Sequence, residues 1–89
     1  IGWSTMYDNE EGSRNIAIGS GTLSNNISGQ NNTSIGGFSG YNSLGDGNVC
    51  LGYNAGYFET SNNKLYIENS NSNYPLIYGY FENDFGPFE

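Results

Sequence analysis

The chain has 89 residues, of which two are basic and nine acidic. The net charge of −7 argues against binding to nucleic acid or to an anionic membrane surface, since both need Lys and Arg. Histidine is absent and cysteine occurs once, which excludes an intrachain disulfide, Ser-His-Asp and Cys-His catalysis and the usual zinc sites. Apolar residues make up 35%, below the roughly 45–50% of ordinary globular domains, yet aromatic residues reach 16%, unlike in disordered chains. We therefore expect thin coils with a narrow apolar centre, strengthened by stacking and by association with other chains.

One five-residue phrase, which begins with Asn and ends with Gly, occurs three times. It spans Asn15–Gly19, Asn32–Gly36 and Asn48–Gly52, so that its glycines are 17 and 16 residues apart. An Ile-Gly pair at the start of the chain lies 17 residues before the same pair of the first phrase, and we interpret it as a truncated fourth copy in a piece of a longer protein. A fixed period of this length is typical of solenoids, whose coils stack on one another. We therefore predict a parallel β-roll or β-solenoid with 16–17-residue coils over residues 1–58.

Each residue type in the phrase has a predicted structural role. The residues between Asn and Gly alternate, which is typical of a β-strand with aliphatic side chains on one face and a small side chain on the other. The small position is taken by Ala17, Ser34 and Cys50, so we interpret the cysteine as a buried structural thiol. We predict that the glycines form tight corners at φ > 0, and that the asparagines bond turn backbone or pair with their own copies in a ladder. The structural repeat residues are Asn15, Gly19, Asn32, Gly36, Asn48 and Gly52.

Residues 59–81 differ in pattern from the coils and predict a hairpin. A polar-apolar alternation over Lys64–Glu68 and a second β-forming run over Pro75–Phe81 flank a polar turn. Ile67 lies 16 residues after the matching Leu of the last phrase, so the first strand of the hairpin could continue the stack. We predict that the hairpin caps the open edge of the solenoid and that residues 82–89 form a linker or a frayed end.

Aromatic side chains are the best candidates for ligand binding, because exposed rings stack on sugar faces and Tyr adds a polar tip. Trp3 is expected to be structural or to lie at a cut end. Five rings follow the phrase glycines, and we interpret them as ligand-binding candidates against the alternative that they pack between coils or chains. These five are Phe38, Tyr41, Tyr53, Tyr57 and Phe58.

Acidic residues give weaker signals. The segments Asp8–Glu11 and Asp46–Asn48 could bind calcium, but the EF-hand spacing is absent and solvated surface charge explains them as well. A retaining glycosidase needs two carboxyl groups about 5–5.5 Å apart, and no spacing in the sequence singles out such a pair. We therefore assign no catalytic residue, no metal and no cofactor, and we expect a protein that is not an enzyme.

Three further segments follow the repeats in order: Leu51–Tyr57, Asn63–Ile67 and Pro75–Gly79. Together with the Asn-x-Ala-Ile-Gly phrase, they resemble the head repeats of YadA-type trimeric autotransporter adhesins and the bacterial and phage fibre proteins with such repeats. The resemblance covers about Arg14–Phe81. It implies a left-handed parallel β-roll in which three chains form one shaft or head. It also implies an extracellular or cell-surface location, or a place on the fibre of a virion or injection device, with attachment to matrix, a host cell or a glycan.

A physical argument also favours a homotrimer. An isolated stack of this size buries little apolar area, and at ~25 cal/mol per Å² this barely offsets the ordering entropy, whereas three chains around an axis bury a second face. We therefore expect a structural and adhesive segment of an extracellular trimeric fibre, either an adhesin head or a tail fibre, without membrane insertion. The alternatives are a passive spacer whose binding tip lies elsewhere and, less favoured, a tailspike-like enzyme that cleaves glycans.

Overall fold

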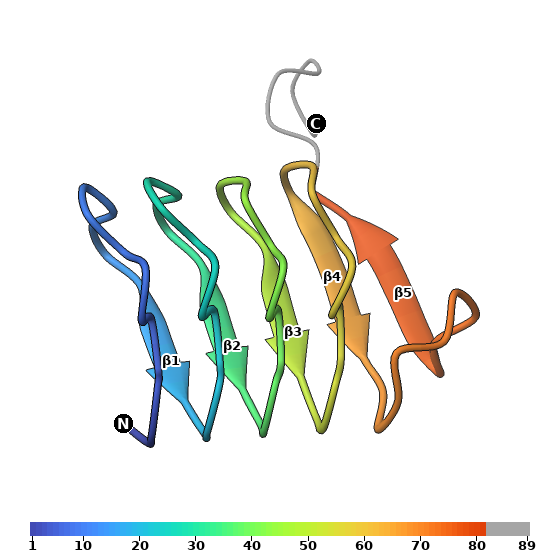
Figure 1. Ribbon diagram of the computed structural model, residues 1–89. Coiled ribbons are helices and arrows are strands. Elements are labelled where there is room, and N and C mark those ends of the chain that lie inside the picture. Colours follow the sequence, from blue (N-terminus) through green and yellow to red (C-terminus); the bar gives the residue numbers. More distant parts are fainter. Residues whose placement is uncertain (82–89) are drawn as a thin grey trace, which may run out of the picture.

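Five short strands lie side by side in one sheet, in the order in which they occur in the sequence (Figure 1). They are β1 (Ile16–Ile18), β2 (Thr33–Ile35), β3 (Val49–Leu51), β4 (Lys64–Ile67) and β5 (Ile77–Tyr80). In the computed structural model, which describes residues 1–81, β1 to β4 run parallel and β5 runs antiparallel to β4. Within that range there is no helix, so the prediction of an all-β chain is confirmed, and the arrangement is compatible with a β-solenoid. The predicted linker at residues 82–89 lies outside the described residues.

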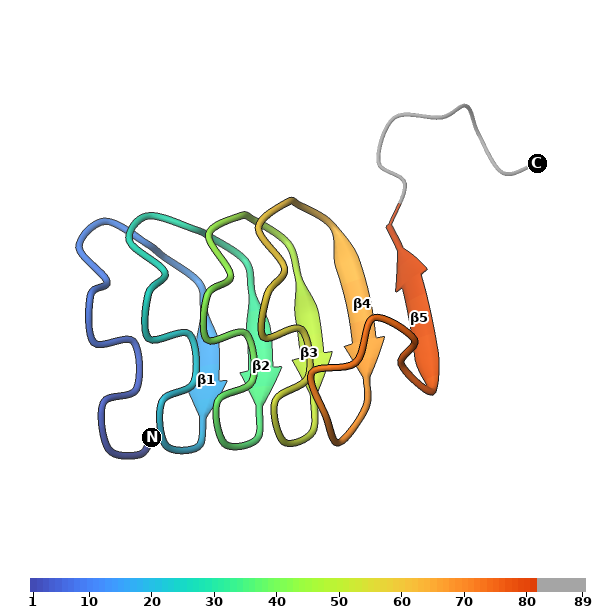
Figure 2. The ribbon, with the colours of Figure 1, turned by 45° about the vertical axis from the view of Figure 1, so that its right-hand side comes forward.

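The repeated phrase sets the register of the sheet. Its small middle residues Ala17, Ser34 and Cys50 are partners in neighbouring strands, and Cys50 pairs in turn with Tyr66 of β4. Successive partners are therefore 17, 16 and 16 residues apart, which is the spacing of the phrases. Figure 2 shows the result: each strand, with the segment that follows it, lies beside those of its neighbour.

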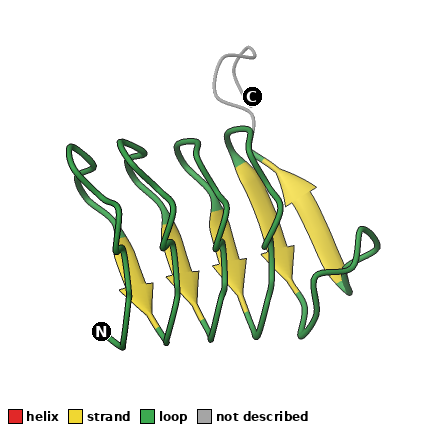
Figure 3. Cartoon of the chain, in the orientation of Figure 1, coloured by secondary structure: helices red, strands yellow, loops and turns green. Residues whose placement is uncertain are grey.

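After each phrase glycine the chain folds back through a succession of turns, which we call a return segment and which Figure 3 shows as a loop. The first turn closes on the glycine, as where the Thr22 N–H donates to the Gly19 carbonyl at 3.2 Å. Adjacent return segments bond one another much as strands do: the Leu23 N–H donates to the Ser39 carbonyl at 3.1 Å. We call a phrase glycine, its return segment and the strand that follows a coil. The coils comprise residues 2–18, 19–35, 36–51 and 52–67.

The interior of the stack is mainly polar, so the expectation of a narrow apolar centre is wrong. The fully buried side chains include those of Asn32 and Asn48, and the buried apolar side chains are small apart from Leu23. Strand and return segment lie so close together that a Cβ added at Gly40 would be 2.9 Å from Ser34 Oγ. Such a narrow space admits Ala, Ser and Cys, and the larger aliphatic strand residues therefore point outward.

Each phrase asparagine bonds the coil that follows its own. Asn32 Oδ1 accepts a hydrogen bond from the Asn48 N–H at 2.8 Å, and Asn32 Nδ2 donates to the Gly45 carbonyl at 2.9 Å. Asn15 and Asn48 repeat both bonds with their own next coils at 2.8–2.9 Å. The predicted ladder therefore exists in altered form, because the amides bond the backbone of the next coil rather than one another. Backbone groups at the turn between return segment and strand are satisfied in this way.

The phrase glycines form the predicted corners. Gly19, Gly36 and Gly52 have φ of +128°, +129° and +116°, where a side chain is strained. A Cβ on Gly36 would also lie 2.6 Å from the carbonyl carbon of Gly52, so the coils could not stack at this spacing. A second column, which the sequence did not reveal, passes through Gly29 and Gly45, where a Cβ would overlap a carbonyl of the next coil.

β4 and β5 form the predicted hairpin, and β4 also continues the stack as the strand of the fourth coil. Tyr66 stands at the inward position that holds small residues in the earlier strands. Its ring meets that of Tyr78 edge-on at 5.1 Å, and its hydroxyl donates to Glu59 Oε1 at 2.7 Å. An aromatic pair thus replaces the small interior residues at the point where the repeat ends.

Candidate functional site

The return segments carry an aromatic strip made of the five ligand-binding candidates. The ring centre of Phe38 lies 5.7 Å from that of Tyr41 and 6.3 Å from that of Tyr53. Tyr57 stacks on Tyr41 at 5.0 Å, with 11° between the ring planes, and meets Phe58 edge-on at 4.7 Å. The fold therefore brings together all five rings, although they do not recur at one position of the repeat.

Coil stacking explains how the strip is built. Tyr41 and Tyr57 are both the fifth residue after a phrase glycine, and each accepts a backbone hydrogen bond from the preceding coil, at 3.0 and 2.9 Å. Because neighbouring strands lie about 4.8 Å apart, equivalent rings in adjacent coils reach stacking distance. These two rings are half-buried, as the packing alternative requires, whereas Tyr53 and Phe58 are 54% and 60% exposed. The strip thus combines a rigid stacked base with open ring faces.

A hollow of about 310 Å³ lies at one end of the strip, and we call it the Tyr53 hollow. Four of the five candidates line it, together with the side chains of Asn54 and Asn71. Ring faces next to amide groups can hold a ligand that is apolar on one face and carries hydroxyls at its edge. The Tyr53 hollow is lined by Phe38, Tyr53, Asn54, Tyr57, Phe58 and Asn71.

Two aromatic residues of the first coil extend the strip, and the sequence analysis missed both as binding residues. Trp3 was expected to be structural or to lie at a cut end, and its side chain is 82% exposed, which disagrees with the first of these alternatives. Tyr7, also exposed, is the fifth residue after Gly2 and so shares the repeat position of Tyr41 and Tyr57, a signal that aligning the coils would have given. Both residues line a second hollow, of about 400 Å³, which also contacts Phe38.

The outward face of the sheet is aliphatic, and we call it the aliphatic face. Ile18 pairs with Ile35 and Ile35 with Leu51, so these outward residues form a column across the strands. Ile67 and Ile77 continue this column into the hairpin. Ile18, for example, is 41% exposed in the single chain. A row of exposed aliphatic side chains of this kind is a candidate interaction surface.

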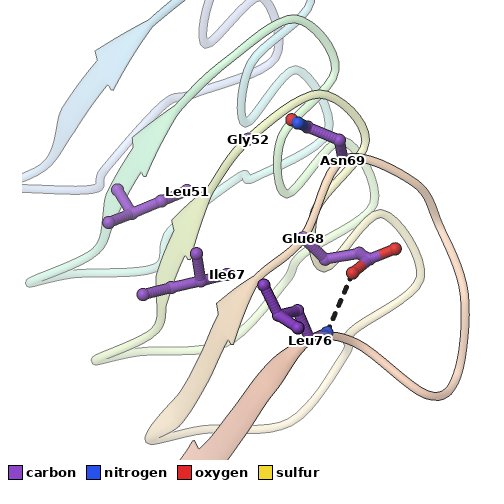
Figure 4. A pocket seen from close by; sticks show the side chains of 6 residues that line it. All are labelled: Leu51, Gly52, Ile67, Glu68, Asn69 and Leu76. Carbon is purple, nitrogen blue, oxygen red and sulfur yellow. Dashed lines mark hydrogen bonds between the residues drawn. The ribbon is translucent and has the colours of Figure 1, made fainter.

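A third hollow, of about 520 Å³, lies between the end of the aliphatic face and the loop of the hairpin (Figure 4). Leu51, Ile67 and Leu76 supply apolar side chains, and one carboxylate, Glu68, stands beside them. Glu68 Oε2 accepts from Ser70 Oγ at 2.6 Å and Oε1 from the Leu76 N–H at 2.8 Å, and these bonds lower the pKa of the carboxyl group. Glu68 is therefore engaged in holding the hairpin loop in place.

Three further side chains with a shifted pKa, those of Cys50, Glu59 and Tyr66, have structural roles. Burial raises the pKa of the Cys50 thiol to about 11, which makes it a poor nucleophile and confirms its interpretation as a buried residue. Partial burial by itself would raise the pKa of Glu59, but hydrogen bonds from the Ser61 and Tyr66 hydroxyls outweigh it and lower that pKa. Burial, and then the bond to Glu59, raise the pKa of Tyr66.

Two features are absent from residues 1–81. No three His, Cys, Asp or Glu side chains converge there on a point that could hold a metal ion. The same residues include no helix with the length and apolar character needed to cross a membrane. The chain matches no protein-family model, and neither a curated protein nor a solved structure is significantly similar to it.

Proposed function

We propose that this chain is a structural and adhesive segment of a homotrimeric extracellular fibre, in which a repetitive surface attaches to glycans. The observation that carries the proposal is the separation of two surfaces: an aliphatic face on the sheet and an aromatic strip on the return segments. One surface suits assembly and the other suits attachment. The resemblance to YadA-type heads and fibre proteins adds the left-handed winding and the location at a cell surface, a virion or an injection device.

The aliphatic face supports the homotrimer. The interior of a single chain is mainly polar and holds few aliphatic side chains, so burial within one chain contributes little hydrophobic stabilisation. Closed threefold symmetry would bury the aliphatic face of each chain against its neighbours and leave no open surface for further growth. The net charge of −7 then keeps the assembled fibre soluble.

The aromatic strip supports attachment. It lies on the return segments, away from the outward face of the sheet, so assembly through the aliphatic face leaves it open. Three copies of a weak site on one rigid column gain avidity on a surface that displays many copies of a ligand.

The oligomeric state tests the assembly half of the proposal. Light scattering after size exclusion should give about 29 kDa, three times the chain mass of 9.7 kDa. Ile35→Asp, in the middle of the aliphatic face, should give a smaller species, because a charge there cannot be buried against another chain. Leu44→Ser, at an exposed aliphatic residue of a return segment, is the matched control and should remain trimeric. A folded, monodisperse monomer of the unaltered chain at micromolar concentration would refute the trimer.

A glycan array probed with the folded chain tests the attachment half. We expect binding to a subset of glycans, reduced by Phe58→Ala, which removes an exposed ring of the Tyr53 hollow. A folded trimer that binds no glycan would instead be a passive spacer.

A further inference from the structure

The second coil interrupts the aromatic strip. The fifth residue after the phrase glycine is Tyr7, Tyr41 and Tyr57 in the first, third and fourth coils, but Ser24 in the second. The backbone there is equivalent, since the Ser24 carbonyl accepts from the preceding coil at 2.9 Å, just as the Tyr57 carbonyl does. The second residue after the glycine is also small in this coil, because it is Gly21. One coil therefore lacks the rings that its neighbours carry on the same surface.

The missing rings leave the second hollow, of about 400 Å³, which we call the Trp3 slot. Adjacent coils hold Tyr41 and Tyr57 with ring centres 5.0 Å apart. At the ~4.8 Å spacing of neighbouring strands, equivalent rings two coils apart, such as Tyr7 and Tyr41, are expected to lie about 10 Å apart. A saturated ring placed midway would lie about 5 Å from each wall, close enough for its C–H groups to contact the aromatic ring faces. Trp3 and Tyr7 of the first coil and Phe38 and Tyr41 of the third coil line the slot. Gly21 and Ser24 of the second coil lie buried beneath it, and the Phe38 ring covers Gly21, where an added Cβ would lie 2.6 Å from the ring.

The polar groups of the slot select the chemistry of the ligand. Asp8 and Asn25 line it and offer a carboxylate and an amide to the hydroxyl groups of a ligand, whereas Ser24 is buried. Neither of the two basic residues of the chain, Arg14 and Lys64, lines the slot. A carboxylate without a nearby cation repels an anionic ligand and accepts hydrogen bonds from a neutral one.

From this arrangement we infer that the Trp3 slot binds a neutral pyranose, whose apolar ring faces lie between the two aromatic walls and whose hydroxyls reach Asp8 and Asn25. The inference rests on the proposed attachment to glycans and names the class, neutral rather than acidic sugars. Sialic acids and uronic acids bring a carboxylate next to Asp8 and are disfavoured.

Trp3 makes the inference directly measurable, because it is the one tryptophan of the sequence. Its fluorescence should change saturably when the chain is titrated with neutral methyl pyranosides and neutral disaccharides. Glucuronate and sialic acid, at matched ionic strength, should bind at least about tenfold more weakly. An equal or stronger response to the acidic sugars would overturn the assigned class.

A filling variant tests the slot itself. Ser24 is only 6% exposed, but three other coils carry Tyr at this position, so Ser24→Tyr should fold with its ring turned outward into the slot, which circular dichroism checks. The fluorescence response of the folded variant to neutral sugars should be lost. Leu44→Ser, far along the return segment of the third coil, is the control and should retain the response. If Ser24→Tyr binds neutral sugars as the parent does, the Trp3 slot is not the site. If glycans bind the array while Trp3 stays silent, the slot is wrong but the adhesive function stands, whereas a chain that binds no glycan in either assay removes both.

Discussion

The columns in the interior of the stack and the columns that carry the aromatic strip on the return segments obey different rules. The phrase positions hold Asn and Gly in every phrase, and the inward strand position holds only Ala, Ser or Cys until the hairpin begins. On the return segments, by contrast, one position changes from Tyr to Ser and back to Tyr within four coils. A change in the interior affects more than one coil, because interior amides such as that of Asn32 bond the backbone of the next coil. The aromatic positions of the return segments vary more, and there the departures from the repeat shape the candidate binding sites.

The largest expected effect comes from the corner glycines. Gly36→Ala places a Cβ at φ +129° and 2.6 Å from the backbone of the next coil, so at least one coil must shift. We expect a loss above about 4 kcal/mol, which approaches the whole stability of a chain of this size. Gly37→Ala is the neighbouring control, since its Cβ would meet Tyr53 at 3.5 Å and the Ser20 carbonyl at 3.9 Å, both ordinary contact distances. Thermal unfolding should separate the two variants widely, and equal melting temperatures would contradict the role given to the corner.

The next effect concerns the amide ladder. Asn32→Ala leaves the Asn48 N–H and the Gly45 carbonyl without their partners in the interior, at a cost of about 2–4 kcal/mol. Asn73→Ala, at an exposed residue of the hairpin loop, should change the free energy of unfolding by less than about 0.5 kcal/mol. Urea unfolding monitored by circular dichroism measures both values. A small loss for Asn32→Ala would mean that water replaces the amide.

The smallest expected effect concerns the hairpin rather than the coils. Tyr66→Phe removes the hydroxyl that donates to Glu59 and should cost about 1 kcal/mol at neutral pH. The lowered pKa of Glu59 stabilises the fold above the unfolded value near 4.5, and this contribution is lost as pH falls through the folded pKa. The raised pKa of Tyr66 acts in the opposite direction, since the unfolded chain ionises there above about pH 10 and stability then falls.

When the pH is lowered or raised from neutrality, Tyr66→Phe should therefore lose less stability than the parent chain does. Unfolding measured at pH 3, 7 and 10.5 tests this expectation. If the free energy of unfolding depended on pH in the same way for both chains, the hydrogen bond between Tyr66 and Glu59 would not govern the stability of the hairpin.

The sequence was sufficient to predict the sheet but not the interior. Asn and Gly at fixed spacing predicted β1 to β3, their register and the positive φ of the corners, because these properties depend on local chemistry. The polar interior was missed, since alternation of Ile and Ala within a strand does not tell which face points inward. The width of the space between strand and return segment decides that question, and it is a property of the whole coil.

The candidate site was predicted in part for a similar reason. The five rings were identified from their residue type, but their contact follows from stacking of different coils. The Trp3 slot depends on the lack of an aromatic side chain at Ser24 and Gly21. In a chain rich in Gly and Ser, such small residues do not stand out in the sequence. Aligning the coils position by position is the step that reveals it.

The side-chain amides of the phrase give the stack of coils a direction. The side chains of Asn15 and Asn32 each accept a hydrogen bond from the backbone N–H of the next phrase asparagine. The side chain of Asn48 accepts one from the Lys64 N–H, and Lys64 has no side-chain amide to continue the series. A duplicated unit of 16 or 17 residues inserted between the second and third coils would find every partner it needs, whereas one added beyond β4 would not. The length of such a column can therefore change by whole units in its middle, while its carboxyl end stays fixed.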